Sequence, residues 1–76
     1  LHSYEEFVKC CQRIYVLDRR NINFVEDQLW LFIHAHSWFE DKIIAAVESH
    51  DDMKEVAAGI RERQAALHED DFLNDN

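Results

Sequence analysis

Three histidines and one glutamate come closest to a metal site in this chain: His34, His36, Glu40 and His50. His36 and Glu40 stand four residues apart, so a continuous helix would place both on one face, as two ligands of one ion require. A tetrahedral zinc site needs further ligands from another segment, and the H-E-x-x-H pair of metalloproteases does not occur. We expect no metal, and metal binding through His36 and Glu40 is the weakest of three functional hypotheses.

Cys10 and Cys11 are the only cysteines. Neighbouring cysteines do not readily form a disulfide with each other. Cys11 also falls on the apolar stripe of a predicted helix, where a thiol acts as a small hydrophobic group rather than a reactive thiolate. The one glycine, Gly59, leaves no phosphate-binding loop, and no G-x-S-x-G motif is found. We therefore expect a protein without catalytic activity or cofactor, in a reducing cytoplasmic setting.

An apolar run from Leu29 to Phe39 is the strongest signal in the sequence. It is too apolar for one face of a helix, yet shorter than the ~18 consecutive apolar residues of a membrane span. Its second face can be covered by other helices of the chain or by a second molecule. We favour a second molecule, with tryptophans as interface anchors. The residues expected in this seam are Trp30, Leu31, His34, Trp38 and Phe39.

Acidic charge is concentrated in the C-terminal third. The chain carries a net charge of -8, and residues 48–76 hold nine acidic against three basic side chains. Phosphate contacts need clustered lysine and arginine, so we expect no direct binding to nucleic acid and no membrane association. A basic protein partner suits this charge, since complementary charge speeds association. The residues of the expected acidic partner-binding face are Glu48, Asp51, Asp52, Glu55, Asp70 and Asp71.

The composition favours helix throughout, because the chain has no proline and a single glycine. Apolar residues at helical spacing predict helices over about 4–18, 23–47 and 51–68. Residues 1–68 are thus expected to form one all-α domain, a small bundle of three or four helices that dimerises through the seam. Residues 69–76 are expected to be an acidic mobile tail.

Four polar residues mark predicted helix starts. Ser3, Asn23 and Ser49 each precede a periodic segment and suit an N-cap position. Ser37 opens a further S-x-x-E pattern, so the middle helix either continues to Val47 or breaks near Ser37. We favour a continuous helix, because no glycine or proline enforces a break.

Two main hypotheses of function follow. In the first, the protein is a non-enzymatic regulator or inhibitor that presents its acidic face to a basic protein, which can be a nucleic-acid-binding protein if the carboxylates imitate the phosphates of DNA. In the second, the protein is a structural subunit that forms homodimers or larger assemblies through the segment from Trp30 to Phe39.

Overall fold

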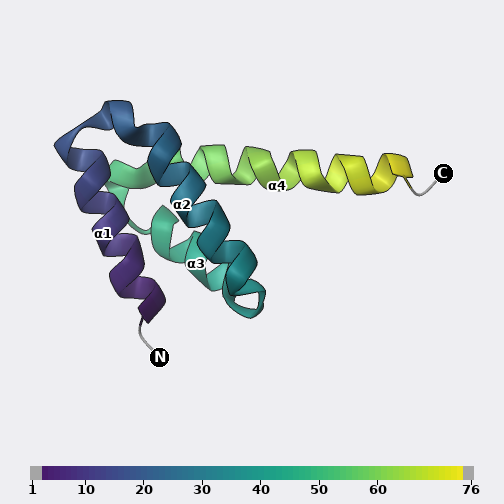
Figure 1. The fold of residues 1–76 in the computed structure, drawn as a ribbon, viewed down its shortest axis with the longest axis horizontal. Helices are drawn as coiled ribbons and strands as arrows, with labels where there is room; N and C mark the ends of the chain where they lie inside the picture. The colour runs from purple at the N-terminus through teal and green to yellow at the C-terminus, as the bar shows by residue number, and fades with distance from the viewer. Residues whose placement is uncertain (1–2, 75–76) are drawn as a thin grey trace.

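The computed structural model describes residues 3–74, with side chains described for residues 4–67. It confirms the expected all-α fold, with four helices and, within residues 3–74, no strand (Figure 1). The α-helices are α1 (Ser3–Leu17), α2 (Ile22–Ala35), α3 (Glu40–Glu48) and α4 (Lys54–Asn74). Three short 3-10 helices connect them: η1 (Arg19–Asn21), η2 (Ser37–Phe39) and η3 (Asp51–Met53).

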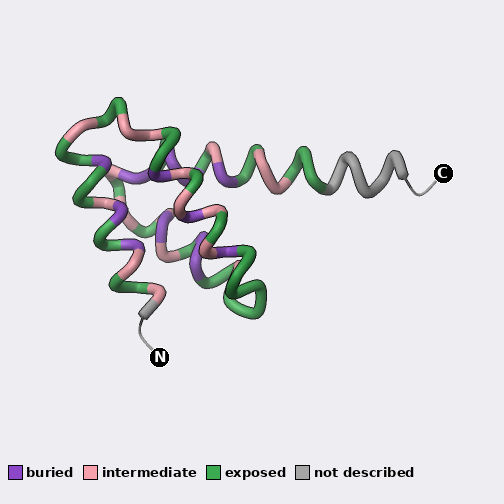
Figure 2. Tube along the Cα trace, in the orientation of Figure 1, coloured by how far each residue is buried: buried purple, intermediate pink, exposed green. Residues whose placement is uncertain are grey.

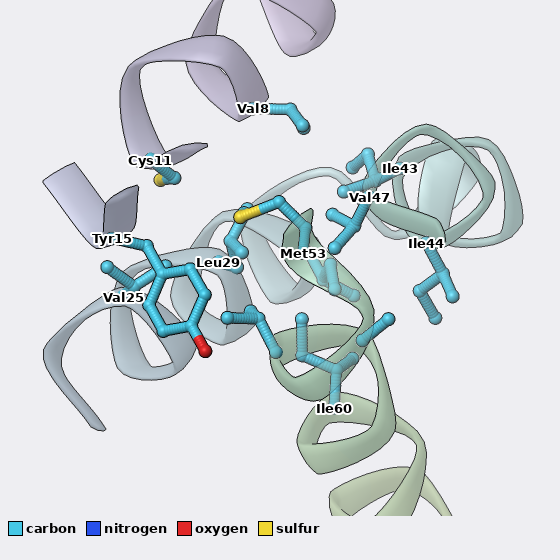
Figure 3. Packing of buried hydrophobic residues seen from close by; sticks show 13 residues of the cluster. Val8, Cys11, Tyr15, Val25, Leu29, Ile43, Ile44, Val47, Met53 and Ile60 are labelled. Atoms are coloured by element: carbon cyan, nitrogen blue, oxygen red, sulfur yellow. The ribbon is translucent and has the colours of Figure 1, made fainter. Parts of the chain in front are cut away.

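The helices pack around one hydrophobic core. α1 contacts α2 and α3, and the first turns of α4 close the bundle against α2 and α3. α4 then continues past the other helices, so its C-terminal end lies far from α1 (Figure 1). Figure 3 shows the core side chains converging from all four helices and η3. The buried hydrophobic residues are Val8, Cys11, Tyr15, Val25, Leu29, Ile33, Ile43, Ile44, Val47, Met53, Val56, Ala57 and Ile60.

The favoured continuous middle helix is wrong, because the chain breaks at His36. This residue leaves the helical region (φ -129, ψ 54), and its N–H donates to the carbonyls of Phe32 and Ile33. A straight helix over residues 22–48 would extend about 40 Å. Ile33 and Ile44 would then lie about 16 Å apart along one axis, on a single rod rather than in one compact core. The fold back at η2 brings both into it, so burial outweighs helix continuity.

The predicted caps are also corrected. α2 begins at Ile22, so Asn23 lies inside the helix, and the side chain that caps this corner is Asp18, which accepts from the N–H of Arg20 at 3.0 Å. Ser49 is the C-cap of α3 and His50 is the N-cap of η3, and the Ser49 hydroxyl donates to the carbonyl of Ala46 at 2.6 Å. The side chain of Ser3 lies outside the described ones.

The last helix is longer than predicted. Its backbone is helical to Asn74, beyond the expected end at about residue 68. The side chains of residues 68–74 lie outside the described ones, so the mobility of the segment 69–76 stays a prediction. Within the part of the chain that the structure describes, no helix is long and apolar enough to span a membrane.

Candidate protein-binding surface

α2 divides its apolar residues between two faces. Val25, Leu29 and Ile33 are spaced by four residues and are fully or almost fully buried. Phe24 and Leu31 stand seven residues apart, which is two helical turns, so they share another face. Their exposed fractions are 53% and 63%. One face of α2 therefore builds the core and another presents large apolar side chains to solvent.

The corner that follows α2 is exposed as well. The break at His36 turns the chain into η2, where Trp38 is 93% exposed and Phe39 is 45% exposed. Figure 2 shows η2 as a continuous exposed stretch. Phe39 is oriented by neighbours on two sides: its ring stacks at 6.2 Å on Tyr4 of α1, and the Lys42 ammonium lies 6.0 Å from it. We use the name α2–η2 surface for the large apolar residues that these two consecutive elements expose, Phe24, Leu31, Trp38 and Phe39.

The formal charge around this surface is negative. The sequence has no lysine or arginine between Arg20 and Lys42, whereas it has four acidic residues there. Asp27 is exposed and pairs with Arg63 of α4 at 2.8 Å, and Asp41 is exposed at the start of α3. The other two acidic residues are Glu26 and Glu40. A ligand of the α2–η2 surface thus meets apolar side chains with exposed carboxylates close by in the sequence, Asp27 on α2 and Asp41 on α3.

Most of the expected seam lies outside the core. Leu31, His34, Trp38 and Phe39 are exposed, and Trp30 is half-buried, with its ring edge-on to His34 at 4.7 Å between centroids. That a second molecule covers these side chains stays a prediction. Sequence reasoning missed Phe24, although its seven-residue spacing from Leu31 was a usable signal.

Three members of the expected acidic face bind other helices of the same chain. Asp52 accepts from the side-chain amide of Gln12 at 2.9 and 3.0 Å, and Glu55 accepts from the hydroxyl of Tyr15 at 2.8 Å. Glu48 pairs with Arg61 at 3.2 Å, and this hydrogen-bonded guanidinium lowers the pKa of the Glu48 carboxyl. Asp51 is exposed. The side chains of Asp70 and Asp71 lie outside those described.

The pair considered for metal binding is not brought together by a helix. His36 sits at the break, with its Nδ1 3.1 Å from the carbonyl oxygen of Phe32. Glu40 begins the next helix and accepts from the side-chain amide of Gln64. His36 and Glu40 therefore do not lie one turn apart on a continuous helix, as the metal-binding hypothesis required. Among the described residues, no group of three or more histidine, cysteine or acidic side chains is placed to hold an ion.

The two cysteines differ in environment. Cys11 is buried, and desolvation, with a smaller contribution from Cys10, raises the pKa of its thiol to about 11. A thiol with so high a pKa is a poor nucleophile at neutral pH. Cys10 is exposed on α1.

A carboxylate lies almost buried between α2 and α4. Glu26 has a side chain 12% exposed, and its Oε1 lies 3.6 Å from the Arg63 guanidinium. A Cβ at Gly59 would lie 2.5 Å from the carboxylate atoms of Glu26, so the glycine leaves the space that this carboxylate fills. Desolvation raises the pKa of Glu26, although Arg63 opposes the shift. Glu26 and Gly59 are 33 residues apart, and no local pattern predicts that they meet.

Comparison of the chain with protein-family models, with curated proteins and with solved structures finds no match.

Proposed function

We propose that this protein is a non-enzymatic interaction module that binds a basic protein partner through the α2–η2 surface. The observation that carries the proposal is Trp38, an aromatic side chain with 93% of its surface exposed. Tryptophan is among the residues that contribute most binding energy at protein interfaces. Its exposure in the isolated chain costs hydration free energy, which a partner would recover by covering it.

The basic character of the partner is argued from charge. Asp27 is exposed on α2, where it pairs with Arg63, Asp41 is exposed at the start of α3 directly after η2, and the whole chain has a net charge of -8. Lysine and arginine around an apolar pocket of the partner would be attracted to this surface, and like charge would exclude acidic proteins.

The acidic face is a secondary contributor in this proposal. Glu48, Asp52 and Glu55 are bonded within the bundle, which reduces what they can offer a partner. Asp51 is exposed and is the described member of that face best suited to contact another protein. A regulator or inhibitor of a basic, nucleic-acid-binding protein would use both regions, with the apolar residues as anchors and the carboxylates for steering.

The test is an affinity capture from the native host, with wild type and two matched variants. Leu31→Ser/Trp38→Ser removes two exposed apolar residues from the α2–η2 surface, and Leu67→Ser removes one that is 47% exposed on α4. We expect wild type and Leu67→Ser each to capture one basic protein in stoichiometric amount and to release it as salt rises. The double variant should not capture this protein. Capture unaffected by the double variant would contradict the proposal.

The same experiment separates the structural alternative. If the α2–η2 surface is a seam between copies of this chain, an untagged copy would be the only protein retained by tagged wild type. That contact would resist salt, because apolar burial is not screened. The double variant would then release the second copy, and the regulatory proposal would be wrong.

A further inference from the structure

We propose that two aromatic residues of α1, Tyr4 and Phe7, are positioning residues for partner binding. They hold the corner at His36 and η2 in the conformation that presents Trp38. The inference rests on the proposed function, because it assigns how the α2–η2 surface is kept ready to bind. Neither Tyr4 nor Phe7 belongs to that surface.

Trp38 depends on the backbone for its position. Its side chain is 93% exposed, so contacts within the chain restrain it little. It lies in η2, which begins directly after the break at His36. The N–H of Phe39 donates to the carbonyl of His36 at 2.9 Å, so His36 also starts the turn of η2. Contacts that fix His36 and Phe39 therefore fix the segment that carries Trp38.

His36 is held against Phe32 of α2 in three ways. Its backbone N–H donates to the carbonyl of Phe32 at 3.0 Å, and its ring Nδ1 lies 3.1 Å from the same oxygen. Its ring also stacks on the Phe32 ring, with 4.3 Å between centroids and 30° between planes. The conformation at the break therefore depends on where the Phe32 ring lies.

Phe7 of α1 fixes the Phe32 ring. The two rings stack with 4.3 Å between centroids and 11° between planes, and both residues are partly buried against the core. Such aromatic pairs contribute more than the burial of their area. Phe32 thus stacks on two rings at once, and aromatic contacts link Phe7 of α1 to His36 at the break.

Tyr4 makes a second link from α1 to the corner. It stands three residues before Phe7 and so lies on the same side of α1. Its ring stacks on Phe39, with 6.2 Å between centroids and 13° between planes. Figure 1 shows the first turns of α1 and the η2 corner at the same end of the bundle. The two links hold η2 at both ends, one through His36 and one at Phe39.

This arrangement prepares the corner for binding. The chain has no proline, so contacts rather than covalent geometry must restrict the backbone around η2. A segment that is already held in its bound conformation loses less conformational freedom when a partner covers it. Loss of either ring in α1 should therefore weaken binding at a surface to which that ring does not belong.

Hydrogen exchange of the backbone amides, measured by NMR on the full chain without a partner, tests the positioning. Phe7→Leu and Tyr4→Leu remove a ring but keep an apolar side chain, whereas Phe7→Tyr and Tyr4→Phe keep the ring. We expect the amides of His36 and Phe39 to exchange about threefold to tenfold faster in the leucine variants, because local opening becomes easier. The variants that keep the ring should exchange at the wild-type rate.

Tyr15→Phe is the control, because it removes a different contact of α1, the hydrogen bond to Glu55, and leaves both stacks in place. It should lower stability without accelerating exchange at the corner. Tyr4→Leu lies in the first turn of α1 and serves if Phe7→Leu does not fold. Corner amides that exchange at the wild-type rate in the leucine variants, or as fast in the variants that keep the ring, would overturn the inference.

Affinity capture from native-host lysate with the same variants tests the consequence for binding. The amount of basic protein that wild type retains should fall about threefold to tenfold in the leucine variants and stay unchanged in Tyr15→Phe. Faster exchange at the corner with full retention would overturn the role in binding. If wild type retains no basic protein, the proposed function fails, and the exchange rates still decide whether the two rings hold the corner.

Discussion

Tyr15 is the residue at which the bundle combines burial with a polar contact. Its side chain is fully buried, and its hydroxyl donates to the Glu55 carboxylate at 2.8 Å. The hydrogen bond to Glu55 and then burial raise the pKa of Tyr15 above its usual value of 10.0. The Tyr15 hydroxyl therefore holds its proton more tightly in the folded than in the unfolded chain. While it is protonated, its hydrogen bond to Glu55 links α1 to α4.

Tyr15→Phe is expected to lower the free energy of unfolding at pH 7 by about 1 kcal/mol, the usual net value of one hydrogen bond. The stability from the raised pKa is complete below pH 10 and is lost as the pH rises through the folded-state pKa. The difference between wild type and variant should thus shrink above pH 10. Urea unfolding at several pH values measures it, and a constant difference would contradict the role given to this bond.

Gly59 and Glu26 are expected to be energetically coupled. Gly59→Ala should gain up to ~1 kcal/mol from helix propensity. In wild type the new Cβ displaces the Glu26 carboxylate and disturbs its contact with Arg63, so the gain should be reduced or reversed. In a Glu26→Ala background the full gain should return. A double-mutant cycle by urea unfolding measures this, and additive effects would show that the carboxylate moves at no cost.

At the scale of elements, the orientation of α2 decides which residues are available to a partner. Leu29 and Leu31 are two residues apart on this helix, yet Leu29 is fully buried and Leu31 is 63% exposed. The core therefore depends on one face of α2 and a partner would depend on another, so substitutions can separate stability from binding.

Leu29→Ala is expected to cost about 2–5 kcal/mol and to leave little folded protein, because it opens a cavity in a small core. Leu31→Ala should change the free energy of unfolding by less than ~0.5 kcal/mol. Thermal unfolding followed by circular dichroism compares the two. Similar losses for both variants would mean that α2 is turned about its axis relative to the described packing.

Sequence patterns predicted which helices exist better than where they end. The spacing of Val8, Cys11 and Tyr15 marked the buried side of α1, since local periodicity encodes it. The S-x-x-E pattern at Ser37 left a break there open as an alternative, but local sequence did not decide for it, because no glycine or proline enforces it and the burial that favours it joins residues far apart in the chain. Leu31 and Trp38 were expected to be exposed because they lie off the apolar stripe that is buried. The spacing of apolar residues does not show which molecule covers them.

At the scale of the whole molecule, the uneven charge has opposite effects on folding and on association. The net charge of -8 disfavours the compact state through repulsion, and salt screens it. Salt would also screen the attraction to the proposed basic partner. The net negative charge thus predicts that added salt stabilises the fold and weakens partner binding.

We expect the melting temperature to rise by a few degrees from low to physiological salt, since ~1 kcal/mol corresponds to about 4–8 °C for a domain of this size. Over the same range partner binding should weaken. Calorimetric melting and the capture experiment, run in the same buffers, measure both. A melting temperature that falls with salt would mean that attractive ion pairs such as Arg61 with Glu48 dominate the electrostatics of folding.

Binding of a basic protein to the α2–η2 surface can be tested by site-specific photocrosslinking in the native host. A photoreactive side chain is placed in turn at Leu31, at Trp38 and, as a control, at Leu67. We expect one basic protein to be crosslinked from positions 31 and 38 and none from position 67. Crosslinks from 31 and 38 only to another copy of this chain, or no crosslink there at all, would contradict it.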